Sequence, residues 1–363
     1  MAKKTSRGDF AAVPVAKARQ TQIYYDSSSY SAFPHVVPLE GDELLLAFRQ
    51  APRQKAAVRH THPRSIITVI RSYDLGGSWA LDDAAQLAAG GGQELGLIYL
   101  GGGKVGGALA AHEVAPEREA ERAGWPAVHA HEYPFSNVGA LWCWSDNYGL
   151  TWRVDNTLLV GDSMQACAPP VRLSDGTLLI PAYGSTGRSS VSSAVLYRSE
   201  DGGASWSQGT NMARGRANTR DYHEPVVMEL APGYLLGLHR IAPRDGGQRG
   251  LFWRNESEDN GLSWSRPKPT DILSGACPRL LTLRDGRLLL TYGRRFEPFG
   301  LYAALSEDQG KSWGQSWLLR PAANGDQGYS SSVELEDGYV FTACYGQNGR
   351  GITGITGTFW AVP

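Results

Sequence analysis

The sequence lacks several features that would assign it to a class at once. No apolar segment approaches the roughly 20 residues of a membrane-spanning helix. Its four cysteines are widely spread, and no two of them form a Cys-x-x-Cys motif. Neither sign of charge is in excess, because 35 lysines and arginines stand against 36 aspartates and glutamates. We therefore expect no membrane span, and neither nucleic acid nor an acidic membrane as a partner.

The N-terminal 20 residues are basic but contain no apolar run of the length that a signal peptide has. We expect residues 1–20 to form a flexible arm. Without a recognisable export signal, the protein is expected to be cytoplasmic, with its cysteines as reduced and buried thiols. Hydrophobic residues make up 42% of the chain, which is typical of a folded soluble domain.

Helical patterns are scarce, and residues 115–124 are the one candidate. Glycine and tryptophan are abundant, with 44 and 11 residues, and both recur in a Ser-x-Asp-x-Gly-x-x-Trp motif. Each copy follows a short alternating apolar run, so the motif predicts a hairpin turn. Ser and Asp side chains would bind the backbone N–H groups of this turn, and Gly would supply a positive φ. The copies span residues 199–206, 257–264 and 306–313, with looser versions at 72–79 and 145–152.

A second set of turns alternates with the first. Each of these turns lies between two apolar runs, so we interpret them as six more hairpins. Together the two sets predict six four-stranded antiparallel sheets, which form a six-bladed β-propeller. We expect one all-β domain over residues 21–363, with an early strand at 21–25 that completes the last blade and closes the ring. The second set lies at residues 40–43, 101–104, 174–177, 231–234, 284–287 and 336–339.

The Ser-x-Asp-x-Gly-x-x-Trp turn resembles the Asp-box, or bacterial neuraminidase repeat, of the sialidase superfamily, and the resemblance covers nearly the whole chain. It implies a sialidase-like propeller. The Asp-box is a structural turn distant from the catalytic pocket, so it carries no chemistry of its own. Sialidases hold the substrate carboxylate with three arginines. They use a tyrosine nucleophile that a glutamate activates, and an aspartate as the acid and base.

The resemblance places three of these roles on single residues. Tyr329 of "GYSSSVEL" matches the nucleophile that opens the last blade. Glu224 of "HEPVVMEL" matches the glutamate that opens a middle blade, and Arg240 of "YLLGLHR" matches the arginine that closes the next strand. Arginine suits carboxylate binding because its guanidinium donates two parallel hydrogen bonds. The candidates for the fifth-blade arginine are Arg279, Arg294 and Arg295.

Two positions depart from the family pattern. Ala32 of "YSAFPHV" stands where the first arginine is expected, and "RHTHPRS" brings His60 and His62 to the place of the aspartate. Histidine can act as acid or base because its ordinary pKa lies near neutrality. The resemblance thus implies a changed substrate, with little release of sialic acid. Two residues are candidates to replace the missing arginine: Arg49 and Arg59. Three more are expected to bind substrate: Tyr222, His223 and Asp326. If neither histidine is the acid, the candidates are Glu94, Asp221 and Asp326.

Two His-x-His pairs, His60 with His62 and His129 with His131, raise the question of a metal site. Residues two apart on a strand face the same way, so four imidazoles could meet one ion. Both loops look exposed, however, and neither pair is clearly on a strand. We predict a single histidine acting as acid or base, with no metal and no cofactor.

The sequence predicts an exo-acting glycoside hydrolase that removes a terminal sugar, acidic or neutral, from a glycan. One alternative is a polysaccharide lyase that cleaves a uronate-containing glycan by β-elimination, for which Arg240, a histidine and Tyr329 supply the residue types. A second alternative is a propeller that binds glycans without turnover. In each case the expected partner is a glycan or oligosaccharide.

Overall fold

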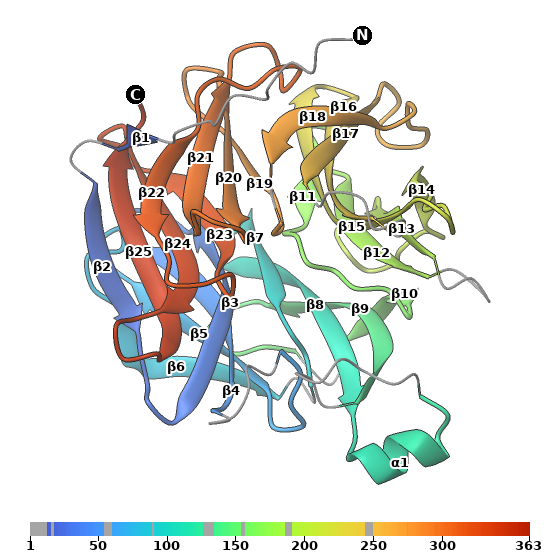
Figure 1. Ribbon diagram of the computed structural model, residues 1–363, viewed down its shortest axis with the longest axis horizontal. Helices are drawn as coiled ribbons and strands as arrows, with labels where there is room; N and C mark the ends of the chain where they lie inside the picture. Colours follow the sequence, from blue (N-terminus) through green and yellow to red (C-terminus); the bar gives the residue numbers. More distant parts are fainter. Residues whose placement is uncertain are drawn as a thin grey trace, which may run out of the picture.

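The strands of the computed structural model form six sheets around a central axis, which confirms the six-bladed β-propeller (Figure 1). The structure describes residues 13–15, 18–53, 60–88, 91–125, 134–153, 157–185, 191–243, 250–273 and 275–363. Within each blade the strands are antiparallel and follow one another from the axis outward.

The first three blades contain four strands each. Blade 1 consists of β3 (Ser29–Pro38), β4 (Leu44–Pro52), β5 (Ile66–Ser72) and β6 (Ala80–Ala88). Blade 2 consists of β7 (Leu95–Gly101), β8 (Lys104–Val114), β9 (Phe135–Ser145) and β10 (Leu158–Asp162). Blade 3 consists of β11 (Val171–Arg172), β12 (Leu178–Ser185), β13 (Ser192–Ser199) and β14 (Thr210–Ala213).

The last three blades complete the ring. Blade 4 consists of β15 (Arg220–Ala231), β16 (Tyr234–Pro243), β17 (Leu251–Ser257) and β18 (Lys268–Leu273). Blade 5 consists of β19 (Arg279–Thr282), β20 (Leu288–Arg294), β21 (Gly300–Ser306) and β22 (Trp317–Pro321). Blade 6 consists of β23 (Gly328–Glu334), β24 (Tyr339–Gln347), β25 (Thr353–Ala361) and, from the other end of the chain, β2 (Arg19–Tyr24).

The N-terminal segment closes the ring and extends one blade. Strand β2 pairs with β25, as expected from residues 21–25, and lies beside it in Figure 1. It begins at Arg19, whose guanidinium lies 4.0 Å from the centroid of the Phe359 ring, so the propeller starts two residues before the expected boundary. A two-residue strand, β1 (Val13–Pro14), pairs in parallel with β22 and makes the fifth sheet five-stranded. Strand β1 and the first two residues of β2 lie within the expected arm, and residues 1–12 fall outside the described residues.

The Asp-boxes connect the third and fourth strands of five blades, at the ends of the blades away from the starts of the innermost strands. All five use the same hydrogen bonds. In the copy at 257–264, Ser257 Oγ donates to Asp259 Oδ1 (2.8 Å) and accepts from Gly261 N (2.8 Å), while Ser263 N donates to Asp259 Oδ1 (2.8 Å). In the copy at 145–152, Asn147 replaces the aspartate and binds the same groups.

The tryptophan of each Asp-box packs at a junction between two blades. Trp79 of blade 1 lies against Phe341 of blade 6, with ring centroids 6.0 Å apart, and Trp206 of blade 3 lies 5.4 Å from Trp142 of blade 2. Burying a large ring at each junction stabilises the ring of blades because isolated sheets would expose their apolar faces. The motif is therefore repeated because the same junction is built five times. The sixth junction, between blades 5 and 6, is filled by Trp360.

The expected helix is present as α1 (Glu117–Arg122), on the connection between β8 and β9. None of the helices in the described ranges combines the length and the apolar character that crossing a membrane would require. All four cysteines are buried and unpaired by disulfides.

Candidate active site

The starts of the innermost strands meet at the axis, and three of them contain the same irregularity. Phe33, Glu224 and Tyr329 each lie where the register between the first and second strands shifts. Their φ values are 57°, 45° and 46°. A positive φ is costly for a residue with a Cβ, so the surrounding structure must hold these three side chains in place. Each bulge turns one side chain from the face of its blade toward the axis.

Tyr329 and Glu224, which the family resemblance pairs, are in direct contact. The Tyr329 hydroxyl donates to Glu224 Oε1 at 2.5 Å, and Arg240 Nη1 donates to the same oxygen at 2.6 Å. Tyr329 and Glu224 are only 5% and 3% exposed, whereas the Arg240 side chain is 25% exposed. Glu224 Oε2 is buried and has no hydrogen-bond partner among the described residues. A buried carboxylate oxygen without a partner is unfavourable unless a ligand satisfies it.

The charges around this pair fix its protonation. Burial alone would raise the pKa of Glu224, but Arg240, the Tyr329 hydroxyl and Arg295 together hold it below its usual value. Burial and the charge of Glu224 raise the pKa of Tyr329 well above its usual value, although Arg295 and Arg240 oppose this. At neutral pH the pair is therefore a neutral phenol bound to a carboxylate that is ready to accept its proton.

Arg295, and not Arg294, reaches the axis from blade 5. Its guanidinium lies 5.2 Å from the centroid of the Tyr329 ring and donates to the Tyr345 hydroxyl at 2.8 Å. Arg294 instead covers the ring of Phe296 and donates to the Glu297 carbonyl, away from this cluster.

Two glycines bring blades 5 and 6 together beside the cluster. A Cβ on Gly293 would lie 2.8 Å from the Cα of Gly328, so neither position has room for a larger residue. This close approach sets Tyr329, the residue after Gly328, next to blade 5 and its arginine.

Asp326 forms a second acidic centre at the rim. Its Oδ1 accepts from the hydroxyls of Tyr30 (3.0 Å) and Tyr345 (3.2 Å), and it lies 3.3 Å from His60 Nε2. Burial would raise the pKa of Asp326, but the bond to His60 and the nearby charges and hydroxyls lower it. The His60 ring also packs edge-on against Phe33, at 5.5 Å between centroids. His60 is thus held in the cluster, joined to Tyr329 through the Phe33 ring.

Glu94, one of the acids that the sequence analysis named in case neither histidine is the donor, lies beside Arg279 and Cys167. We call these three residues, together with Cys277, the floor of the cluster. It is 4% exposed, and burial raises its pKa to about 8 despite the nearby Arg279 and the Cys167 thiol. Burial prevails because the Arg279 Nη2 atom is 3.7 Å from Glu94 Oε2 and donates its hydrogen bond to the Cys167 carbonyl. Glu94 Oε1 has no hydrogen-bond partner among the described residues. The charge of Glu224 also raises the pKa of Glu94. Arg279 connects the two regions, because it lies beside Glu94 and donates to Cys277 Sγ, which is 4.0 Å from the Glu224 carbonyl oxygen.

Other residues named from the sequence are placed around this cluster. His223 packs against the Tyr183 ring at 5.0 Å, beside Glu224. Arg49 is fully buried and donates to Ser65 Oγ. His62 is buried, and its Nδ1 accepts from the backbone N–H of Arg64.

Two further residues face blade 3, not the axis. Asp221 accepts from the backbone N–H of Ser192 at 2.7 Å, so it fastens blade 4 to blade 3. Tyr222 lies in the packed layer between these two blades, against His239 and Trp253. Arg59, His129 and His131 lie outside the described residues. Within the described ranges, no group of three His, Cys, Asp or Glu side chains could hold a metal ion.

The sequence prediction missed residues that the ring brings to the axis. Cys277 Sγ lies 3.9 Å from the Cys167 carbonyl and 4.0 Å from the Glu224 carbonyl, so both cysteines belong to the floor. Aligning the starts of the six innermost strands would have found them, because each blade places one residue there. The six positions are Phe33, Glu94, Cys167, Glu224, Cys277 and Tyr329, of which the sequence prediction had named Glu94, Glu224 and Tyr329.

Comparisons with known proteins agree with this architecture. Residues 125–342, more than half of the chain, match the family model described as a BNR repeat-like domain. No curated protein matches the sequence significantly. A protein of unknown function from Dyadobacter fermentans superimposes with a TM-score of 0.80 at 22% identity, covering 95% of this chain and 99% of that one.

Two enzymes have the same fold at lower identity. The NanB sialidase of Streptococcus pneumoniae has a TM-score of 0.63 at 12% identity, with 94% of this chain and 70% of that one covered. The α-L-arabinanase of Penicillium chrysogenum has a TM-score of 0.66 at 13% identity, with 94% and 97% covered. At these identities the likeness establishes a shared fold, and the chemistry has to be argued from the residues of this chain.

Proposed function

This chain belongs to the BNR repeat-like domain family, and from that premise we propose that it is a glycoside hydrolase that uses Tyr329 as its nucleophile. The observation that carries the proposal is the buried bond from the Tyr329 hydroxyl to Glu224, whose other carboxylate oxygen has no described partner. The sialidase and arabinanase structures share the fold and support a glycan as the substrate.

The first step forms a covalent sugar–enzyme intermediate. The Tyr329 oxygen attacks the anomeric carbon while Glu224 takes the phenolic proton, and the bond from the anomeric carbon to the leaving oxygen breaks. Arg240 keeps Glu224 ionised before the attack. The structure that surrounds the strained backbone at Tyr329 and Glu224 holds both groups in position, so little reorganisation is needed in the transition state.

Glu94 is the proton donor in this proposal. A carboxyl group with a pKa of about 8 is protonated at neutral pH, while Glu224 nearby is ionised. Two carboxyl groups whose surroundings separate their pKa values in this way are typical of an acid and a base in one site. Glu94 protonates the leaving oxygen. In the second step Glu94 takes a proton from a water molecule, and this water attacks the anomeric carbon. The bond from the sugar to the Tyr329 oxygen breaks, and Glu224 returns the phenolic proton to Tyr329.

His60, one of the two histidines predicted from the sequence as the donor, is the alternative. Its ring is held by Asp326, which orients the imidazole as a carboxylate orients a catalytic histidine. Separate Glu94→Gln and His60→Ala variants distinguish the two, because only the loss of the true donor should lower the rate by about 10²–10⁴-fold.

The substrate is proposed to be a terminal sugar other than an ordinary sialoside. Arg240 and Arg295 flank Tyr329, but on blade 1 the Phe33 ring, 4.9 Å from the Tyr329 ring, faces the axis and Ala32 is fully buried. An arginine lost from a carboxylate clamp costs about 1.5–3 kcal/mol, or one to two decades in affinity. The fully buried Phe33 ring thus fills the place on blade 1 where a clamp arginine would lie.

The test is a screen of the purified chain on aryl glycosides and oligosaccharides, read by both reducing ends and ultraviolet absorbance. We expect new reducing ends without absorbance from an unsaturated uronate, and loss of activity in Tyr329→Phe. Tyr292→Phe is the matched control, because it removes a buried hydroxyl that binds Ser316 Oγ in blade 5, away from the axis.

Other outcomes would overturn the proposal. Absorbing products would identify a lyase, and saturable binding without turnover would identify a glycan-binding propeller. Full activity in Tyr329→Phe would exclude Tyr329 as the nucleophile.

A further inference from the structure

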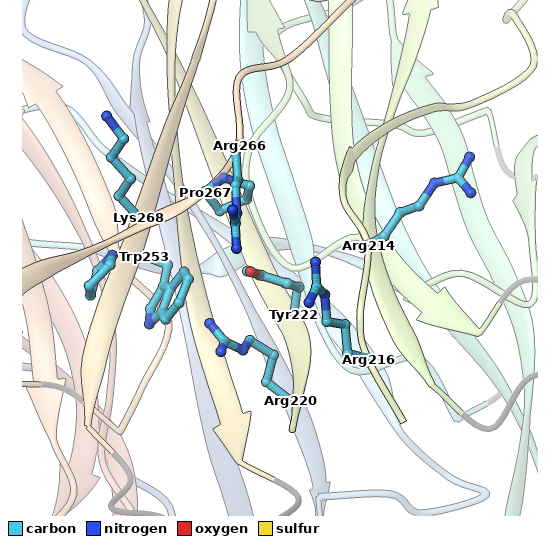
Figure 2. Close-up of a pocket in the computed structure, with 9 residues that line it drawn as sticks. Arg214, Arg216, Arg220, Tyr222, Trp253, Arg266, Pro267 and Lys268 are labelled. Atoms are coloured by element: carbon cyan, nitrogen blue, oxygen red, sulfur yellow. The ribbon is translucent and has the colours of Figure 1, made fainter. Parts of the chain in front are cut away.

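A cavity lies between blades 3 and 4, and its lining includes none of Tyr329, Glu224, Arg240 and Arg295. Its volume is about 470 Å³, within the usual range of ligand sites. Figure 2 shows its lining: Arg214 and Arg216 on the chain between β14 and β15, Arg220 and Tyr222 on β15, Trp253 on β17, and the segment that leads into β18 with the start of that strand. The lining residues are Arg214, Arg216, Arg220, Tyr222, Trp253, Arg266, Pro267, Lys268 and Pro269.

The cavity is strongly basic although the protein is not. Five of its nine lining residues are cations, whereas the whole chain has a formal net charge of −1. Within the described residues none of these five cations forms an ion pair, in contrast to Arg254 and Arg198 near by, which pair with Glu256 and Glu200. Arg214, Arg216, Arg266 and Lys268 are exposed, so water screens their mutual repulsion. The cavity nevertheless presents a locally positive surface to an anion that enters it.

Three of the four arginines lie around the Tyr222 hydroxyl, whereas Arg214 points away from it (Figure 2). The positive charges of Arg220, Arg216 and Arg266 all act on the Tyr222 hydroxyl and lower its pKa, although burial outweighs them and raises it. Arg216 and Arg220 belong to one turn between blades 3 and 4, and Arg266 comes from the segment that leads into β18. Figure 2 shows the three side chains around the Tyr222 hydroxyl. An anionic group at this position would meet several N–H donors and one hydroxyl.

Aromatic and rigid groups form the rest of the lining. The Arg220 guanidinium lies 3.9 Å from the centroid of the Trp253 ring, and this ring meets Tyr222 at 81°. Pro267 and Pro269 also line the cavity. Aromatic side chains with a few polar groups suit a ligand that has both apolar faces and polar substituents, as a sugar has. The cations add a preference for sugars that carry oxyanions.

The cavity adjoins the proposed catalytic residues along one strand. Tyr222 and Glu224 are two residues apart on β15, about 7 Å along the strand, and β15 presents Tyr222 to blade 3 and Glu224 to the axis. A ligand that extends outward from the axis over blade 4 would therefore pass the basic cavity.

We propose that the cavity lined by Arg216, Arg220 and Trp253 binds an acidic saccharide through its carboxylate or sulfate groups. That the anion belongs to the glycan substrate rests on the proposed function, whereas anion binding itself does not. Tyr222, expected from the sequence to bind substrate, acts here and not at the axis.

Calorimetric titration of the full chain tests the proposal. The probes are an oligogalacturonide, a sulfated oligosaccharide of equal length and a neutral oligosaccharide. We expect one or both acidic probes to bind, the neutral one not to bind, and added salt to weaken binding. The double variant Arg216→Ala/Lys268→Ala should weaken binding by at least about tenfold, because two charge-assisted contacts are lost. Arg118→Ala, an exposed arginine on α1, is the control and should bind as the wild type does.

Three results would overturn the proposal: no binding of either acidic probe, equal binding by the double variant, or tighter binding of a single-stranded oligonucleotide. A Glu224→Gln variant separates this inference from the proposed function. It should lose turnover and keep the binding of acidic probes in the basic cavity, so failure of one proposal is visible independently of the other.

Discussion

The pH dependence of folding stability offers a quantitative test of Glu94. Its pKa of about 8 in the folded protein compares with an ordinary value of 4.5. Below 4.5 the carboxyl group is protonated in both states. Between the two values the unfolded chain is ionised and the folded protein is not, so stability falls as pH rises. The slope is about 1.4 kcal/mol per pH unit, which amounts to roughly 5 kcal/mol over the interval.

Glu94→Gln should remove this slope, because an amide stays neutral at every pH in the range. Guanidinium denaturation followed by tryptophan fluorescence, from about pH 5 to about pH 8, measures the difference in unfolding free energy. We expect the variant to gain stability relative to the wild type as pH rises. Glu121→Gln on the exposed side of α1 is the control for the loss of one carboxylate. Curves for wild type and Glu94→Gln that run parallel would show that Glu94 is ionised in the folded protein, and would refute its role as a proton donor.

Three further predictions address the site and the scaffold. Sialic acid aryl glycosides should be turned over poorly, and robust release of sialic acid would show that another arginine completes the clamp. His60→Ala should retain most of the activity on the best substrate if Glu94 is the donor, and a loss of 10²-fold or more would move that role to His60. Asp259→Ala should lower the free energy of unfolding by about 1–2 kcal/mol in thermal denaturation, as the loss of a comparable capping side chain does. Catalysis should be unchanged because this Asp-box turn lies far from the axis, and a change in activity would contradict that separation.

The fold could be predicted because its signal is local. Within one Asp-box, Ser257 binds Asp259 and the backbone N–H of Gly261, which are two and four residues away. Because these contacts are local, the motif alone predicts the turn. The spacing of the two sets of turns then determines the number of strands and blades. The pairing of β1 with β22 had no such signal, because two residues carry no periodicity.

The site was only partly predictable because it depends on the irregularities of the innermost strands. The resemblance to sialidases identified Tyr329 and Glu224, which the structure brings into contact. A regular alternation cannot tell which of Tyr222 and Glu224 faces the axis, since the register shift after His223 decides it. Glu94 stood only among the reserve acids because its raised pKa results from burial by residues of other blades.

The central claim is that Tyr329 forms a covalent bond to the sugar, and mass spectrometry of a trapped intermediate tests it most directly. A fluorinated glycoside with a good leaving group, built on the best substrate from the screen, slows the second step more than the first and lets the intermediate accumulate. We expect the peptide containing Tyr329 to gain the mass of the fluorinated sugar, and the Tyr329→Phe variant to gain none. A label on another residue, or continued turnover of this glycoside with no labelled peptide, would contradict it.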